Sequence, residues 1–229
     1  MSGYPQMSFG NVIGSNIANI GLVLALTSIV SPVKVDNESL GLNYPMMIGA
    51  SFALMIVMYF FNGINWLIGS VFLIALIIFL VVAVTKSSHD QEEDVEIDQS
   101  LNFSKSLILL LLGALGLYFG ADWFIKGAVN IAKSFNIDER IISLSLVAIG
   151  TSIPELAVSL IAAFKKQNGF ALGNLIGSNI FNILAVLGIS SLFVDLSLED
   201  TTLFYSDITW MIAFALMLYP LIKIGKKIC

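Results

Sequence analysis

The segment GNVIGSNIANI at residues 10–20 recurs as GNLIGSNIFNI at residues 173–183, which is 163 residues further along the chain. The two copies differ at two positions, so nine of eleven residues are identical. Glycine-rich apolar motifs also occur where membrane helices dimerise, but that use does not require the shared Asn and Ser positions. The repetition therefore favours two related halves within one chain.

The composition places the chain in lipid rather than in water. Hydrophobic residues make up 57% of the 229 residues and charged residues 12%, with a mean hydropathy of +0.91. One water-soluble core of this size cannot hide so much apolar surface. From stretches that can supply the roughly 20 apolar residues of a bilayer span, we predict seven transmembrane helices, near residues 8–31, 44–62, 64–85, 105–125, 141–164, 170–193 and 203–222. The predicted fold class is an all-α integral membrane protein.

The order of these spans predicts that the two copies of the motif cross the membrane in opposite directions. Each copy lies at the start of a span, and five predicted spans separate the two starting points. Because five is odd, the second copy enters the bilayer from the side opposite to the first. Many secondary transporters contain such inverted repeats and place their substrate site near the bilayer midplane, between the repeats.

The charges predict an orientation. Six of the sixteen acidic residues lie at residues 90–98, inside a polar segment, residues 86–104, that is typical of a solvated linker. Calcium regulation through these acids is a weaker alternative, because the segment lacks the glycine turn and spaced ligands of an EF-hand. Eight of the eleven basic residues fall on the linker side of the membrane. The positive-inside rule then places the linker and the C-terminus in the cytoplasm.

Glu155 is the one acidic residue well inside a predicted span, in the stretch LVAIGTSIPELAVSL at residues 146–160. An acid at that depth costs about 2.5–3.5 kcal/mol on insertion scales, so it needs a compensating partner. No Lys, Arg or His lies in the interior of a predicted span. We therefore expect the carboxylate to bind a cation or to carry a proton.

The neighbours of Glu155 carry the oxygen atoms that a hard cation prefers. Pro154 has no N–H, and its ring clashes with the carbonyl group four residues back, so the helix should break and free the carbonyl oxygen of Gly150. Thr151 and Ser152 add two hydroxyl groups. Calcium binds this mixture of carboxylate, hydroxyl and carbonyl oxygens. The alternative is a proline kink whose hydroxyl groups bond to the backbone.

The repeated motif adds two polar stripes, because residues spaced i, i+4 and i+8 share one helix face. The stripes consist of Asn11, Ser15 and Asn19 in the first copy and of Asn174, Ser178 and Asn182 in the second. We expect the glycines of the motif to let another helix approach closely. These glycines are Gly10, Gly14, Gly173 and Gly177. The two stripes and the broken acidic helix are predicted to meet at the centre of the molecule.

These motifs resemble a known family. GTSIPEL at residues 150–156, followed by GNLIGSNIFNI, resembles the second signature repeat of the calcium/cation antiporter superfamily, whose best-known members are sodium/calcium exchangers. GADWFIKGA at residues 120–128 resembles the segment that opens each half in that family, and the acidic linker resembles its cytoplasmic loop. The resemblance covers the whole chain. It implies ten spans in two inverted halves, with the ions held by four central helices.

The resemblance also implies a site and an activity. Glu155 is the expected ligand shared by calcium and sodium, and we expect the other oxygens to come from Gly150, Thr151, Ser152, Ser178, Asn182, Ser15 and Asn19. Some members carry an acid in place of Asn182. The amide makes the site less negative, so Na⁺ is the expected coupling ion, H⁺ is the alternative, and K⁺ is disfavoured.

The expected function is exchange of Ca²⁺ for Na⁺ by alternating access, in a multi-pass protein of the cell membrane. We expect no enzymatic activity, no cofactor besides the transported ions, and no nucleic-acid partner. An intramembrane hydrolase is disfavoured, because the predicted spans contain no histidine and no second deep acid. A passive channel would differ from an exchanger in needing no counter-ion gradient. An inactive fragment or a non-transporting membrane subunit is the alternative of another class.

The chain departs from the family pattern at its ends. Nine residues precede Gly10, whereas the first half in the family carries a GTSxPE-type segment before this motif. We therefore expect a truncated chain, which resembles the middle seven spans of ten. We expect residues 1–85 to belong to the first half, residues 86–104 to be the linker and residues 105–229 to form the second half. With one carboxylate at the site, this chain alone is expected not to transport.

Overall fold

Five helices are long and apolar enough to cross a membrane within the part of the chain that the structure describes. That part of the computed structural model comprises residues 5–35, 39–87, 103–135, 148–165, 168–197, 202–225 and 227–228. The five candidate spans are Ser8–Val30, Leu40–Phe61, Trp66–Lys86, Phe103–Ser134 and Phe170–Phe193. Two shorter apolar helices lie within the two other predicted spans: Ile153–Phe164 covers the second half of residues 141–164, and Tyr205–Leu221 covers most of residues 203–222. The all-α membrane class is confirmed.

The first half of the chain folds into helical segments with short extended connections. In order they are α1 (Pro5–Ala18), η1 (Asn19–Leu24), α2 (Ala25–Val30), β1 (Val33–Lys34), η2 (Ser39–Asn43), α3 (Tyr44–Phe61), β2 (Gly63–Ile64) and α4 (Trp66–Ser87). The segments η1 and η2 are π-helical. Because α1, η1 and α2 follow one another without a break, they form one bent membrane-spanning unit.

Among the described residues, the second half contains three further helices before the same pattern begins again. Its elements are α5 (Phe103–Ser134), α7 (Ala148–Thr151), α8 (Ile153–Phe164), α9 (Asn168–Phe181), η4 (Asn182–Leu187), α10 (Gly188–Phe193), β3 (Leu196–Ser197), α11 (Thr202–Gly225) and β4 (Lys227–Ile228). The division of the chain at residues 85 and 104 stays a prediction, because most of the linker lies outside the described residues.

The secondary structure repeats with the same spacing as the sequence motif. The boundaries of α1, η1, α2 and β1 recur 163 residues later as those of α9, η4, α10 and β3. Both units contain a π-helical segment that begins at the last asparagine of the motif, Asn19 or Asn182. The helices α3 and α11 follow β1 and β3 in the same order. The repeat seen in eleven residues of sequence therefore extends over a whole supersecondary unit.

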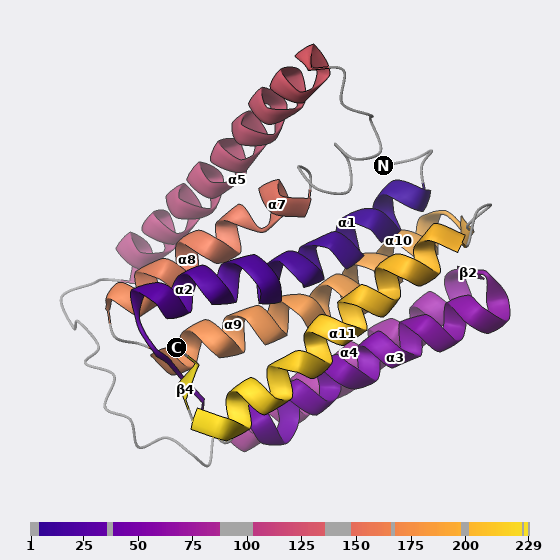
Figure 1. The fold of residues 1–229 in the computed structure, drawn as a ribbon, viewed down its shortest axis with the longest axis horizontal. Coiled ribbons are helices and arrows are strands. Elements are labelled where there is room, and N and C mark those ends of the chain that lie inside the picture. Colours follow the sequence, from indigo (N-terminus) through magenta and orange to yellow (C-terminus); the bar gives the residue numbers. More distant parts are fainter. Residues whose placement is uncertain are drawn as a thin grey trace.

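Two small antiparallel ladders have symmetric pairings. In one ladder β1 pairs with β4, with Val33 opposite Ile228, and in the other β2 pairs with β3, with Ile64 opposite Leu196. Exchanging the two repeats converts one ladder into the other. Figure 1 shows β4 and β2 at opposite ends of the molecule. An approximate two-fold axis therefore relates the repeats and inverts their direction.

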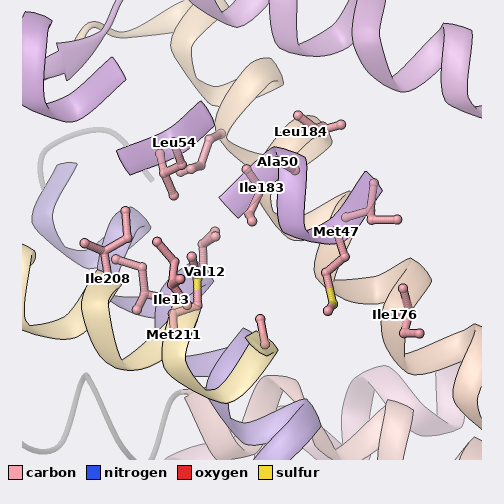
Figure 2. Packing of buried hydrophobic residues seen from close by; sticks show 14 of the residues in the cluster. Val12, Ile13, Met47, Ala50, Leu54, Ile176, Ile183, Leu184, Ile208 and Met211 are labelled. Atoms are coloured by element: carbon pink, nitrogen blue, oxygen red, sulfur yellow. The ribbon is translucent and has the colours of Figure 1, made fainter. Parts of the chain in front are cut away.

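The apolar core lies where the two repeats cross. Helices α1 and α9 pack among α3, α11, η1 and η4, and their buried side chains form one cluster. Figure 2 shows Ile208 and Met211 of α11 beside Val12 and Ile13 of α1, with Ala50 and Leu54 of α3 near Ile183 and Leu184 of η4. This packing holds the two motif helices against each other.

Helix α5 lies at one edge of the molecule, beside α7 and α8 (Figure 1). Its apolar side chains are largely exposed, as suits contact with lipid. The helix is longer than the predicted span of residues 105–125, because it continues to Ser134. It consequently contains Lys126, which the predicted span left outside, and Lys126 Nζ pairs with Asp122 Oδ2 at 2.7 Å. Thirty-two residues of helix exceed the roughly 30 Å of a bilayer core, so this pair can lie near the membrane surface.

The close helix contacts do not lie at the motif glycines that the structure tests. A β-carbon at Gly173 or Gly177 would meet no atom within 4 Å, so the expectation of a close approach is wrong for these two glycines, and it stays a prediction for Gly10 and Gly14. The tight contacts lie elsewhere, between Gly69 of α4 and α10 and between Gly150 and Ile125 of α5. The sequence shows where the small residues are. The tertiary packing decides which of them contact another helix closely.

Candidate cation-binding site

The predicted helix break occurs beside Glu155. Helix α7 ends at Thr151, Ser152 lies outside regular helical geometry at φ −91° and ψ −1°, and α8 begins at Ile153 with Pro154 in its first turn. Proline is well tolerated at that position, because the first N–H groups of a helix have no partner within the helix. The break therefore places three successive polar groups at the start of α8: the hydroxyls of Thr151 and Ser152 and the carboxylate of Glu155.

A chain of hydrogen bonds joins the broken helix to the first repeat. The Thr151 hydroxyl lies 2.8 Å from Ser15 Oγ, 3.1 Å from Asn11 Oδ1 and 3.0 Å from the Ala148 carbonyl oxygen. Thr151 has one hydroxyl hydrogen for these three oxygen atoms. Where that hydrogen bonds to Asn11 Oδ1 or to the Ala148 carbonyl oxygen, Ser15 is the donor in the shortest contact. The lone pairs of Ser15 Oγ are then left for another partner.

Four asparagines meet where the two repeats cross. Asn16 Nδ2 donates to the Asn179 carbonyl oxygen at 3.2 Å, and Asn179 Nδ2 donates to the Asn16 carbonyl oxygen at 3.3 Å. Asn19 Nδ2 donates to Asn179 Oδ1, and Asn182 Nδ2 donates to Asn16 Oδ1, both at 2.9 Å. Each bond has its counterpart in the other repeat. The two-fold axis must therefore pass between Asn16 and Asn179.

Three of the predicted ligands carry buried oxygen atoms with no hydrogen-bond partner. These atoms are Asn19 Oδ1, Ser152 Oγ and Glu155 Oε2. Buried oxygens without a donor are costly, and buried charges are normally paired or bound to a metal. The elements that carry them adjoin, because η1 packs against α8. The Ser178 hydroxyl interacts by a hydrogen bond with the Glu155 carboxylate. These three oxygens therefore have no protein donor, although the buried Nδ2 of Asn174 on α9 is also without a partner.

The structure brings most of the predicted ligands to one region. Thr151 contacts Ser15, Ser178 contacts Glu155, and Asn19 and Asn182 both join the asparagine cluster. Gly150 is buried against Ile125 of α5, and no contact places its carbonyl oxygen among the other ligands. Within the described residues, no group of three or more His, Cys, Asp or Glu could hold a metal ion. A cation here would depend on one carboxylate and neutral oxygens.

Asn16 and Asn179 are the residues that sequence reasoning missed. They lie one residue beyond Ser15 and Ser178, off the predicted polar stripes. The sequence did contain one indication of their importance, because both copies of the motif carry asparagine at this position. Periodicity could not find them, because their partners lie 163 residues away in the chain.

A family comparison agrees with this architecture. The model of the family described as sodium/calcium exchanger protein matches residues 1–85 and 105–226, which is nearly all of the chain. This chain belongs to the sodium/calcium exchanger family. The matched residues include both copies of the motif and Glu155, and the unmatched segment falls within the acidic linker.

Individual family members extend the comparison. An uncharacterized membrane protein of Methanocaldococcus jannaschii is 39% identical over 223 residues, covering 97% of this chain and 70% of that protein. The sodium/calcium exchanger MaX1 of Methanosarcina acetivorans is 31% identical over 260 residues, with 96% and 73% covered. The structure of the sodium–calcium exchanger NCX_Mj, soaked with 2.5 mM Na⁺ and 10 mM Sr²⁺, matches with a TM-score of 0.76 and 40% identity. It is matched over 98% of this chain and 71% of its own. The chain thus spans about 70% of the length of these relatives.

Proposed function

We propose that this protein takes part in exchange of Ca²⁺ for Na⁺ across the membrane, with the cations bound at the broken helix beside Glu155. The observation that carries the proposal is the set of partnerless buried oxygens on Asn19, Ser152 and Glu155. They come from η1 and from the start of α8, two segments that pack against each other. Membership of the sodium/calcium exchanger family supports cation exchange as the activity.

The proposed ligands have separate roles. The Glu155 carboxylate supplies the negative charge. The Ser152 hydroxyl supplies a buried oxygen that has no hydrogen-bond partner, and Ser15 supplies a second hydroxyl oxygen, 2.8 Å from Thr151 Oγ1. Thr151 both orients Ser15 and adds its own oxygen. The further proposed oxygens are those of Gly150, Ser178, Asn19 and Asn182. Calcium takes six to eight such oxygens, and this set contains the right kinds.

The charge of the site favours Na⁺ as the counter-ion. One carboxylate balances one monovalent cation, whereas a divalent cation keeps about one uncompensated positive charge in a medium of low dielectric constant. The same two ions can therefore compete for Glu155 without either being held too tightly to leave. Exchange of Ca²⁺ for H⁺ is the alternative, because Glu155 is the group that a proton would occupy.

The inverted repeat supports alternating access as the mechanism. The two units have the same secondary structure, cross at the asparagine cluster and are related by an axis between them. In transporters of this type, rocking of one repeat against the other opens the central site to either side of the membrane in turn. The proposed ligands come from both units, so such a movement would change the site itself.

Competition between the two ions tests the site. Purified protein in detergent should gain thermal stability with Ca²⁺, because a ligand at a hundred times its Kd stabilises by about 2.7 kcal/mol. Added Na⁺ should shift this Ca²⁺ response to higher concentration, whereas choline at the same ionic strength should not. A response to Ca²⁺ that Na⁺ leaves unchanged would contradict the shared site.

Exchange itself is tested in membrane vesicles from cells that express the gene in its natural context. Vesicles loaded with Na⁺ should accumulate Ca²⁺, and Glu155→Gln in the chromosomal gene should abolish this uptake. Uptake that is equal with and without a Na⁺ gradient would indicate a passive channel. Uptake that depends on a proton gradient would select the alternative counter-ion.

A further inference from the structure

The hydrogen bonds of Asn16 and Asn179 carry an inference about how the site is oriented. We propose that these two asparagines are positioning residues, which hold the amides of Asn19 and Asn182 so that oxygen atoms, rather than N–H groups, face the cation. This inference rests on the proposed function, since it concerns the ligands of the same site. Neither Asn16 nor Asn179 is itself among the proposed ligands.

The backbone sets the orientation of the two positioning residues. The Nδ2 atom of each lies 3.2–3.3 Å from the carbonyl oxygen of the other. A carbonyl oxygen accepts hydrogen bonds and cannot donate them, so the amide nitrogen must be the atom that points at it. A rotated amide would place two oxygens against each other. The Oδ1 atoms of Asn16 and Asn179 therefore have a fixed direction.

These fixed oxygens orient the ligands. Asn179 Oδ1 accepts from Asn19 Nδ2 and Asn16 Oδ1 accepts from Asn182 Nδ2, both at 2.9 Å. An amide that turns its NH₂ group toward such an acceptor presents its oxygen on the other branch. For Asn19 this oxygen is buried and has no protein partner. A cation is attracted by the oxygen end of the amide dipole and repelled by the N–H end, so the orientation decides whether Asn19 can be a ligand.

The second N–H of each positioning residue is also used. Asn16 Nδ2 lies 3.7 Å from Met211 Sδ, and Asn179 Nδ2 lies 3.6 Å from Met47 Sδ. Asn16, Asn19 and Asn179 are 1%, 0% and 2% exposed, so water cannot replace a lost partner. The donors and acceptors of the two positioning residues are thus matched, and one orientation satisfies them all.

The hydrogen bonds that orient Asn19 and Asn182, called the relay below, connect one repeat to the other. Asn19 of the first repeat is oriented by Asn179 of the second, and Asn182 of the second repeat is oriented by Asn16 of the first. Neither repeat can set the direction of its own asparagine ligand. The orientation of both ligands consequently depends on the contact between the repeats.

A double-mutant cycle tests the relay, with the Ca²⁺ concentration that gives half of the maximal thermal stabilisation as the readout. Asn179→Leu removes the acceptor for Asn19 without a large change in volume, and it should raise this concentration about tenfold, the effect of roughly one hydrogen bond or ligand. In an Asn19→Ala background, Asn179→Leu should change it less than about twofold, because coupled residues are not additive. Leu54→Met is the control: it changes a buried apolar side chain of the same core on α3 and keeps the hydrogen bonds of the four asparagines, so the concentration should stay within about twofold.

The results of these experiments distinguish a failure of the positioning role from a failure of the proposed cation site. If Glu155→Gln leaves the Ca²⁺ response unchanged, the proposed function is wrong and the positioning role falls with it. If Glu155→Gln abolishes the response but Asn179→Leu acts equally with and without Asn19, Asn179 is a structural contact and the positioning role alone is wrong. The symmetric cycle with Asn16→Leu and Asn182→Ala gives the same decision in the other half, and it replaces the first if Asn179→Leu yields no folded protein.

Discussion

At the scale of single residues, the Glu155 carboxylate carries the charge of the proposed site. Glu155→Gln keeps the shape of the side chain and removes the charge, so Ca²⁺ should no longer stabilise the protein against heat. A loss of binding follows because neutral oxygens alone do not compensate a divalent ion at low dielectric constant. The matched control is Asp122→Asn, since Asp122 is a carboxylate on α5 that already pairs with Lys126 at 2.7 Å. That control should keep the Ca²⁺ response, and an equal loss in both variants would contradict a specific role for Glu155.

The Thr151 hydroxyl links the two repeats at one atom. Thr151→Val replaces it by a methyl group of similar size and leaves the buried Ser15 hydroxyl without its partner at 2.8 Å. We expect a loss of about 1–3 kcal/mol in stability, the cost of an unsatisfied buried polar group. Thr151→Ser keeps the hydroxyl and should lose less. Thermal unfolding of the two variants in detergent measures the difference, and equal midpoints would show that the hydrogen bond contributes little.

At the scale of elements, the broken helix depends on its packing against α5. A β-carbon at Gly150 would overlap the Ile125 side chain, so Gly150→Ala should destabilise the protein by about 1–3 kcal/mol through overpacking. Ile125→Ala should restore part of this loss in the double variant. Gly120→Ala is the control on α5, because its β-carbon would meet no atom within 4 Å. Protease resistance or thermal unfolding distinguishes them, and a neutral Gly150→Ala would show that α7 can shift away from α5.

The π-helical segments belong to the same scale. In each repeat the segment begins at the motif's last asparagine, Asn19 or Asn182, and π-helical turns are frequent at functional sites. The wider turn changes the direction in which following residues point. In an ideal α-helix, residues spaced i, i+4 and i+8 stay on one face. Here the last residue of each predicted polar stripe is the first residue of the π-helical segment, so the stripe does not continue beyond it.

At the scale of the whole molecule, the inverted repeat predicts a topology. Ser197 of β3 and Ser88, which lies outside the described residues, are predicted to be on opposite sides of the membrane. With Cys229 removed, Ser197→Cys should react with an impermeant thiol reagent outside intact cells, and Ser88→Cys should react only after the membrane is opened. The opposite pattern would reverse the orientation derived from the basic residues. Equal labelling of both positions would contradict the inverted repeat.

Much of the fold could be predicted because its signals are local in the sequence. Apolar length predicted seven membrane segments, and five helices of the described residues are long and apolar enough to span a bilayer. Pro154 located the helix break, since a missing N–H acts within one turn. The fourth span was predicted too short, because it was ended before Lys126, which forms an ion pair with Asp122 inside the helix. The prediction for Gly173 and Gly177 was wrong, because a small side chain permits a close contact without specifying its partner.

The sequence by itself determined the membrane setting, the repeat, and a deep acid that no basic residue in the predicted spans neutralises. Only the tertiary structure decided which oxygens are free. Ser15 is brought within 2.8 Å of the Thr151 hydroxyl, 136 residues away, so the two share a hydrogen bond beside the helix that carries Glu155. Asn19 presents its oxygen because Asn179, 160 residues away, takes its N–H. The sequence shows which hydrogen bonds each residue can donate or accept. Which partner each donor binds depends on how distant segments of the chain pack together. The oxygen atoms that remain without a donor are the ones that can bind a cation.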